Sequence, residues 1–265
     1  MKKGILYQIG KRTVDFINGL QETCAFVGEI CCRTFEVVFM PKRFRFGDMM
    51  LALERAGSNG VAINALVGFL LGVILAFQSA TSLQMFGVEV YVADLMAIGL
   101  FRELGPIVTA ILLAGRSGSA FAAEIGTMKV DEELDALETM DLPPVRFLVL
   151  PRIVAAMIAM PLLTIICELA GLIGGALVLK MMNIPLSVYW NHVADSSTVF
   201  MILLGLAKAV VFGLVIAIVG CGAGMRTRNT ADGVGVAATK AVVGGILSVV
   251  ILDGIIAVIC YIFNV

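Results

Sequence analysis

Apolar residues follow one another in long runs along most of this chain, and short polar segments separate the runs. A helix needs about 20 apolar residues to cross the hydrocarbon core of a bilayer. Five runs reach that length, at about residues 61–80, 93–115, 153–179, 198–222 and 241–263. The pattern therefore predicts an all-α membrane protein with five transmembrane helices.

The first 50 residues have a different pattern, in which charged positions such as Lys11 and Glu29 recur among apolar positions such as Phe16 and Ile30. A helix with this mixture has one polar and one apolar face. Such a helix lies in the plane of the membrane surface rather than crossing it. We therefore expect residues 1–50 to form an interfacial amphipathic region.

Basic residues are concentrated on one side of the predicted membrane. Of the 19 Lys and Arg residues, nine precede the first span, among them the cluster Lys42, Arg43 and Arg45. Four more lie between the second and third spans and three between the fourth and fifth, whereas Lys180 alone falls on the opposite side. The positive-inside rule then places the N-terminus in the cytoplasm. An odd number of spans places the C-terminus in the periplasm.

Composition agrees with a membrane location and excludes other classes. Hydrophobic residues make up 60% of the chain and charged residues 15%, against roughly 25% charged in soluble proteins. The net charge of −1 gives no indication of a nucleic-acid partner. Because no internal repeat or low-complexity tract is visible, we expect a single membrane domain over 1–265, with its five-span core at 61–263.

The sequence lacks the motifs of enzymes and metal sites. Its six cysteines form no CxxC pair and have no zinc-like spacing with the single histidine, His192. It has no GxxxxGK[ST], HExxH or GxSxG motif. We therefore expect no catalytic residue, no metal ligand and no ATP hydrolysis in this chain.

The segment Gly115–Met140 is too polar to span the membrane. From Val130 onward, Leu134, Leu137 and Met140 recur at three-residue spacing among acidic residues, which predicts a short helix with one apolar edge. Such a helix can dock into a groove of a partner protein. For an isolated segment, a solvated surface helix is the simpler interpretation.

Four charged residues fall at similar depth within the predicted spans: Arg102, Glu103, Lys208 and Asp253. A charge at the bilayer centre costs about 2.5–3.5 kcal/mol on insertion scales, so such residues need partners or water. Their charges sum to zero, which fits either salt bridges that fix helix packing or a polar ring in a cavity. For Glu168 the sequence leaves three positions open: the cavity, a pair with Lys208, or a subunit interface.

Glycines suggest close helix packing. The pairs Gly68–Gly72 and Gly171–Gly175 have GxxxG spacing, which fits packing within the subunit as well as dimerisation. The Gly105-Pro106 pair predicts a kink in the second span.

Several motifs together resemble the signature of the MlaE/YrbE permease family, the membrane subunits of ABC-type, MCE-associated lipid transporters. They are RELGP at 102–106, AGRSGSA at 114–120, AEIGTM at 123–128 and DALE at 135–138. The resemblance extends over nearly the whole chain. It implies a bacterial inner-membrane homodimer with cytosolic ATPase subunits beneath it, which bind ATP and Mg²⁺, and a periplasmic MCE-domain protein above it. No cofactor is then expected in this chain.

The resemblance also implies two functional regions. The first is a coupling helix between spans two and three that contacts the ATPase, with the candidate residues Glu124, Gly126, Met128, Asp135, Leu137 and Glu138. The second is a lipid cavity with charged groups near its floor and apolar walls, with the candidates Arg102, Glu103, Lys208, Asp253, Leu75, Phe77, Leu83 and Phe86. In this cavity Arg102 and Lys208 would meet a lipid phosphate.

We therefore expect ATP-driven movement of phospholipid, or a related hydrophobic lipid, between the inner membrane and the MCE carrier. The alternative is a proton-coupled secondary transporter that uses the buried carboxylates Glu103, Asp253 and Glu168. That alternative leaves the acidic segment unexplained, and the chain has no paired repeat halves. The sequence determines neither the lipid headgroup nor the direction of transport.

Overall fold

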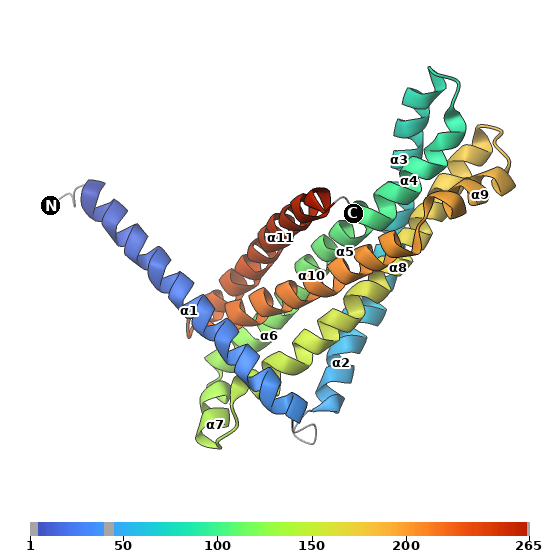
Figure 1. The fold of residues 1–265 in the computed structure, drawn as a ribbon. Helices are drawn as coiled ribbons and strands as arrows, with labels where there is room; N and C mark the ends of the chain where they lie inside the picture. Colours follow the sequence, from blue (N-terminus) through green and yellow to red (C-terminus); the bar gives the residue numbers. More distant parts are fainter. Residues whose placement is uncertain (1–4, 40–44, 264–265) are drawn as a thin grey trace.

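The computed structural model describes residues 5–39 and 45–263, and every regular element within these residues is a helix (Figure 1). Five helical rods in this part of the chain are long and apolar enough to cross a membrane, which confirms the predicted number of spans. Each rod overlaps one predicted span and is longer than it. The rods comprise Phe46–Gln84, Glu89–Val130, Val145–Met181, Val199–Met225 and Ala231–Ile262.

Three rods are built from several helical segments that join without a loop. The first contains α2 (Phe46–Gly57), η2 (Ser58–Gly60) and α3 (Val61–Gln84). The second contains η3 (Glu89–Tyr91), α4 (Val92–Gly99), η4 (Leu100–Leu104), α5 (Gly105–Leu113), η5 (Ala114–Gly118) and α6 (Ser119–Val130). The third contains η6 (Val145–Val149) and α8 (Leu150–Met181), and the last two rods are α10 (Val199–Met225) and α11 (Ala231–Ile262). The remaining helices are α1 (Ile5–Phe39), α7 (Glu133–Thr139) and α9 (Leu186–Ser196).

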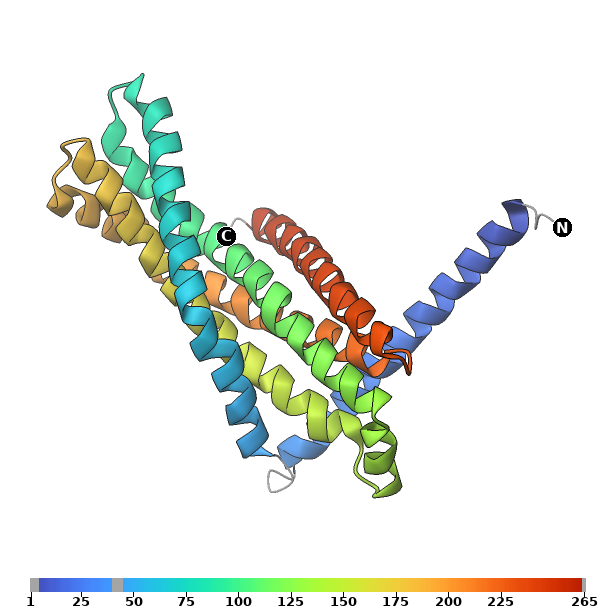
Figure 2. The ribbon, with the colours of Figure 1, turned by 180° about the vertical axis from the view of Figure 1, so that it is seen from behind.

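The N-terminal helix α1 leaves the bundle at an angle, so its first half lies apart from the other helices (Figures 1 and 2). Farther along, α1 contacts η6 and α10. Residues 46–50, which we expected in the interfacial region, instead begin the first rod. Of the predicted basic cluster, Lys42 and Arg43 lie outside the described residues.

The α3 and α8 helices make the most extensive contact in the bundle. Glycines allow their backbones to touch: a Cβ atom on Gly68 would collide with the backbone of Cys167, and one on Gly72 with the backbone of Gly171. Both GxxxG pairs therefore contribute to packing within the subunit, the first of the two possibilities that the sequence left open.

The second rod passes through two π-helical segments, η4 and η5. In η4 the N–H of Gly105 bonds to the carbonyl of Leu100, five residues earlier. Pro106 has no N–H, so it cannot bond to the carbonyl of Arg102 four residues before it. The helix continues through this irregular turn, which lies where the sequence predicted a kink.

The last span, α11, is the least buried of the five: only 11% of the most apolar 18-residue stretch of this helix is buried. Its exposed side chains are large and apolar along most of its length, including Val243, Leu247 and Ile251. This face requires lipid or another apolar surface around it.

Candidate functional site

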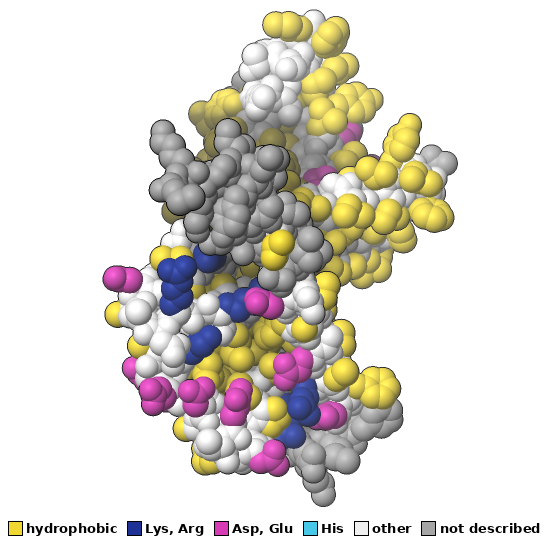
Figure 3. All heavy atoms as spheres, turned by 90° about the vertical axis from the view of Figure 1, so that its left-hand side faces the viewer, with side chains coloured by type: hydrophobic (Ala, Val, Ile, Leu, Met, Phe, Trp, Pro, Cys, Tyr) yellow, Lys and Arg dark blue, Asp and Glu magenta, His cyan; other side chains and the backbone are white. Residues whose placement is uncertain are grey.

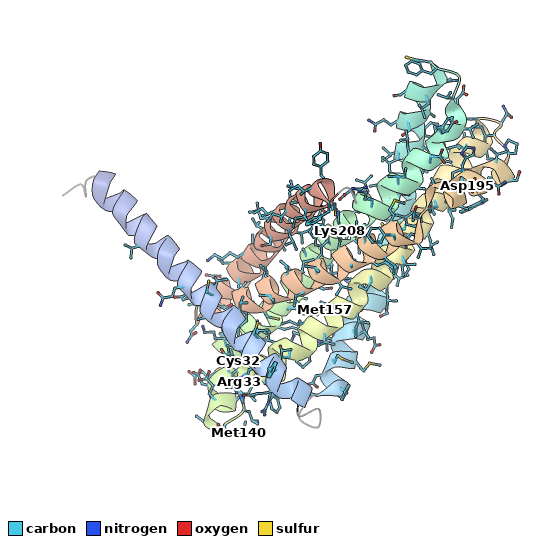
Figure 4. All side chains as sticks on the ribbon, in the orientation of Figure 1. Cys32, Arg33, Met140, Met157, Asp195 and Lys208 are labelled. Carbon is cyan, nitrogen blue, oxygen red and sulfur yellow. The ribbon has the colours of Figure 1, made fainter. Side chains whose placement is uncertain are left out.

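Lys208 lies at the centre of a charged network between three spans (labelled in Figure 4). Its Nζ on α10 donates to Glu103 Oε2 of η4 at 2.7 Å and to Asp253 Oδ1 of α11 at 3.1 Å. The Nε of Arg102 lies 3.7 Å from Glu103 Oε1. The structure thus brings together all four intramembrane charges singled out in the sequence.

The irregular turn in the second rod supplies a further ligand for Lys208. Its Nζ donates to the Arg102 carbonyl at 3.3 Å, the carbonyl that Pro106 leaves without its helical N–H. A lysine ammonium has three donors, and the three contacts match that number. The carbonyl to which Pro106 cannot donate therefore accepts a hydrogen bond from the buried ammonium instead.

The network is buried at one end and accessible at the other. The exposed side-chain fraction rises from 2% at Lys208 and 14% at Asp253 to 32% at Glu103 and 38% at Arg102. An incoming anionic group would therefore meet Arg102 before it could reach Lys208. A guanidinium can bind a phosphate through two parallel hydrogen bonds.

The four apolar candidates do not gather around this network. Leu75 and Leu83 pack against a hydrophobic cluster that includes Met96 and Tyr189. By contrast, Phe77 and Phe86 are exposed. All four lie on α3 or directly after it, whereas the charged network lies on η4, α10 and α11.

Glu168 packs against span two within the subunit. It is buried on α8, and a Cβ atom on Gly105 would lie 2.7 Å from its Cγ. Among the residues that the structure describes, Glu168 forms no ion pair, and Lys208 contacts other partners instead. The sequence left three possible environments for Glu168, and the structure excludes one of them, a pair with Lys208.

Glu124 connects three rods at the end of the bundle that carries α7. From α6, its two carboxylate oxygens lie 2.9 Å from Arg55 Nη1 of α2 and 2.9 Å from Arg152 Nη2 of α8. The sequence placed Glu124 in a polar loop, but the helix of the second rod continues to Val130 because apolar side chains of α6, such as Phe121, are buried in the core. The two arginine partners were not identified from the sequence. Local sequence patterns do not show which residues far apart along the chain come into contact.

Two further coupling candidates on α6 also face the bundle. A Cβ atom on Gly126 would lie 2.8 Å from Thr227 Oγ1, so this glycine permits close approach to the end of α10. Met128 is partly buried against the main hydrophobic cluster.

The remaining candidates lie on α7, a short helix at the predicted place between spans two and three. Leu134 is buried and Leu137 is partly buried against the core, whereas Met140 is 60% exposed. Asp135 and Glu138 are exposed. Acidic side chains line this end of the molecule in Figure 3, and Figure 1 shows that α7 protrudes there.

The other end of the bundle contains a polar side-chain contact that the sequence did not predict. His192 Nδ1 of α9 lies 3.1 Å from Asp94 Oδ1 of α4. Nearby, Tyr189 is fully buried and donates to the Leu172 carbonyl at 2.8 Å, and burial raises the pKa of its hydroxyl. Within the described residues, no cluster of three or more His, Cys, Asp or Glu side chains could hold a metal ion.

Comparison with known proteins matches this chain to a family of membrane permeases. The family described as Permease MlaE matches residues 49–259. A probable ABC transporter permease protein of Rickettsia typhi is 37% identical over 92% of each chain. The intermembrane phospholipid transport system permease protein MlaE of Haemophilus influenzae is 34% identical over 96% of each chain. The chloroplastic protein TRIGALACTOSYLDIACYLGLYCEROL 1 of Arabidopsis thaliana is 32% identical over 80% of this chain and 61% of its own.

Proposed function

The chain belongs to the MlaE family of non-catalytic ABC transporter permeases, and from this premise we propose that it moves phospholipid, or a related hydrophobic lipid, between the inner membrane and a periplasmic MCE-domain carrier. The observation that carries the proposal is the network around Lys208. Three spans converge on one buried cation that two carboxylates balance, and Arg102 provides a donor at the accessible edge of the network. In this arrangement a lipid phosphate would contact Arg102 while Glu103 keeps Lys208 neutralised.

The assembly that fits this function is a dimer of this chain with cytosolic ATPase subunits, which bind ATP and Mg²⁺. We place the end with α7 in the cytoplasm because most Lys and Arg residues adjoin it, and we place α1 on the membrane surface. The exposed apolar face of α11 is the candidate surface for the second copy, with the lipid cavity between the two.

Coupling to the ATPase would act through α7. Leu134 anchors this helix to the core, while Asp135 and Glu138 remain exposed to a partner. Movement of α7 would be transmitted through α6 to the irregular segments of span two. The two states of the permease must contact the lipid differently for ATP binding to shift their populations.

A proton-coupled mechanism is the weaker alternative. It would use Glu103, Asp253 or Glu168 as a titrating relay. Two of these carboxylates are ion-paired with Lys208, and the relatives are described as ABC transporter permeases.

The first test is purification of the chain with its co-expressed partners, followed by native mass spectrometry. A dimer that carries two ATPase subunits and phospholipid is the expected result. A lone chain that moves lipid or solute without any ATPase would contradict the proposal.

The lipid site is tested with a photoreactive phospholipid. We expect the charge-neutral variant Arg102→Gln/Glu103→Gln/Lys208→Met/Asp253→Asn, which removes all four charges of the network, to remain folded but to lose most crosslinking to spans two, four and five. The matched control, His192→Gln/Asp94→Asn, removes the side-chain contact between His192 and Asp94 at the other end of the bundle and should crosslink like the wild type. Equal crosslinking in the charge-neutral variant and the wild type would exclude a role of the network in lipid capture.

A further inference from the structure

A cavity lies between α1, the end of α10 and the start of α11, separate from the charged network and from α7. Its volume is about 550 Å³. Thr23 and Phe26 of α1 form one wall, and Arg226 Nη1 donates to Thr23 Oγ1 at 3.0 Å across it. The cavity is thus the place where the N-terminal helix meets the last two spans.

Positive charge predominates in this cavity. Arg226, Arg228 and Lys240 line it, and Asp232 is the one acidic residue among the described lining residues. Glu22 adds a second acid, 3.8 Å from Arg226 Nε. Within the part of the chain that the structure describes, Arg228 and Lys240 form no ion pair. Basic side chains are visible on this face in Figure 3.

Backbone geometry adds to the attraction for an anion. The cavity includes the N-terminus of α11, where Thr230 caps the helix by accepting from the Gly233 N–H at 3.2 Å. The first turn of a helix carries partial positive charge from its unpaired N–H groups. Asp232 in the same turn opposes this effect in part, which leaves the three basic side chains as the main source of attraction.

Part of the remaining lining is apolar, which a site for a small inorganic anion would not need. Phe26, Ile218, Val219 and Val236 form this part. A neighbouring groove runs along α11 from Asp232 to Val243. Beyond the groove the exposed apolar side chains of α11 continue into the membrane-spanning region. The site therefore has a polar end for a charged headgroup and an apolar path for acyl chains.

We infer that this cavity binds the phosphate headgroup of an anionic phospholipid, with its acyl chains in the groove along α11 from Asp232 to Val243, which leaves the apolar face from Leu247 onward for the second copy. Basic pockets beside membrane-spanning helices are typical sites for anionic headgroups. This inference goes beyond transport, because the bound lipid is retained and holds α1 against α10 and α11. The site is independent of the network around Lys208.

The test uses the full-length purified chain and a phosphatidylglycerol that carries a photoreactive group on its headgroup. Crosslinked peptides are mapped by mass spectrometry. We expect crosslinks within residues 226–240, competed by unlabelled phosphatidylglycerol but not by phosphatidylcholine or by glycerol phosphate, which lacks acyl chains. Crosslinks at the Lys208 network instead map to residues 99–109, 205–212 and 250–256, so the two sites are read separately.

The variant Arg228→Gln/Lys240→Gln should lower the crosslinking within 226–240 about thirtyfold. The control Arg45→Gln/Lys180→Gln removes the same amount of charge from side chains outside the cavity and should leave the crosslinking within 226–240 unchanged. The charge-preserving variant Arg228→Lys/Lys240→Arg should retain the crosslinking. This result would show that the loss in the Gln variant is caused by the missing charges and not by misfolding. Unchanged crosslinking in the Gln variant, equal loss in the control, or full competition by glycerol phosphate would overturn the inference.

Discussion

At the scale of single residues, the chemistry of this protein centres on Lys208. A lysine buried to this extent within a membrane span is stable only if its charge is balanced and its three donors are occupied. Glu103, Asp253 and the Arg102 carbonyl meet both requirements. The carbonyl is available because Pro106 follows four residues later, so a residue that usually disrupts helices here provides a ligand.

Removing Lys208 alone should cost more stability than removing Lys208 together with its two carboxylate partners. Lys208→Met leaves Asp253 without a cation and Glu103 with only its 3.7 Å contact to Arg102, and breaking a buried ion pair in this way costs about 3–5 kcal/mol. Lys208→Met/Glu103→Gln/Asp253→Asn leaves no buried charge and should recover most of the lost stability. Thermal unfolding in detergent measures both variants. If the single variant is as stable as the wild type, the network does not contribute to folding.

Glu168 provides a test of the rival mechanism. It is buried against Gly105 and forms no ion pair with the described residues. Because glutamine has nearly the same shape, we expect Glu168→Gln to preserve ATP-dependent lipid transport in proteoliposomes. A complete loss of transport in a variant with unchanged stability would instead support a proton relay through this residue.

At the scale of elements, helices in this bundle approach each other through glycine and through polar links at their ends. The α3–α8 contact depends on Gly68, Gly72 and Gly171. The carboxylate of Glu124 then ties the same two rods to α6. The rods can shift against one another only if both kinds of contact adjust.

Adding a methyl group at the α3–α8 contact should separate the two helices. Gly72→Ala places a Cβ atom against the backbone of Gly171, and overpacking of this kind costs about 1–3 kcal/mol. Gly254→Ala on α11 has open space around its Cβ and should be neutral or stabilising by up to about 1 kcal/mol. Unfolding of both variants is compared in the same detergent. Equal stability would show that α3 can move away without cost.

Charge reversal should have different effects at Glu124 and Asp135. Glu124→Lys places a third cation between Arg55 and Arg152, so we expect lower thermal stability. Asp135→Lys alters an exposed side chain of α7 and should leave stability unchanged while it uncouples ATP hydrolysis from transport. Stability, ATPase activity and transport are measured together for each variant. Normal transport in Asp135→Lys would remove α7 from the coupling mechanism.

At the scale of the whole molecule, the two ends of the bundle differ in character. One end has α7, the linked side chains of Glu124, Arg55 and Arg152, and the basic cavity beneath α1. The other end is closed by α9, whose Tyr189 is buried and whose His192 pairs with Asp94. This polarity fits a permease that meets the ATPase at one end and the lipid carrier at the other.

The orientation can be tested by labelling single cysteines with an impermeant maleimide. The exposed Cys24, Cys31 and Cys32 are first replaced by serine, while the buried cysteines remain. Thr139→Cys at the end of α7 should react only after the membrane is permeabilised, because we place this end in the cytoplasm. Ser187→Cys on α9 should react in intact spheroplasts. The reverse pattern would invert the topology.

The sequence alone determined the number of spans, the short helix between spans two and three, and the family, because run length and local motifs do not depend on distant contacts. It did not determine which carboxylates would meet Lys208, that Arg55 and Arg152 would share Glu124, or that Gly72 would pack on Gly171. The physical reason is that these spans are apolar on all sides, so periodicity does not indicate which face points inward. Only the rotation and register of each packed helix decide which charged and small residues meet.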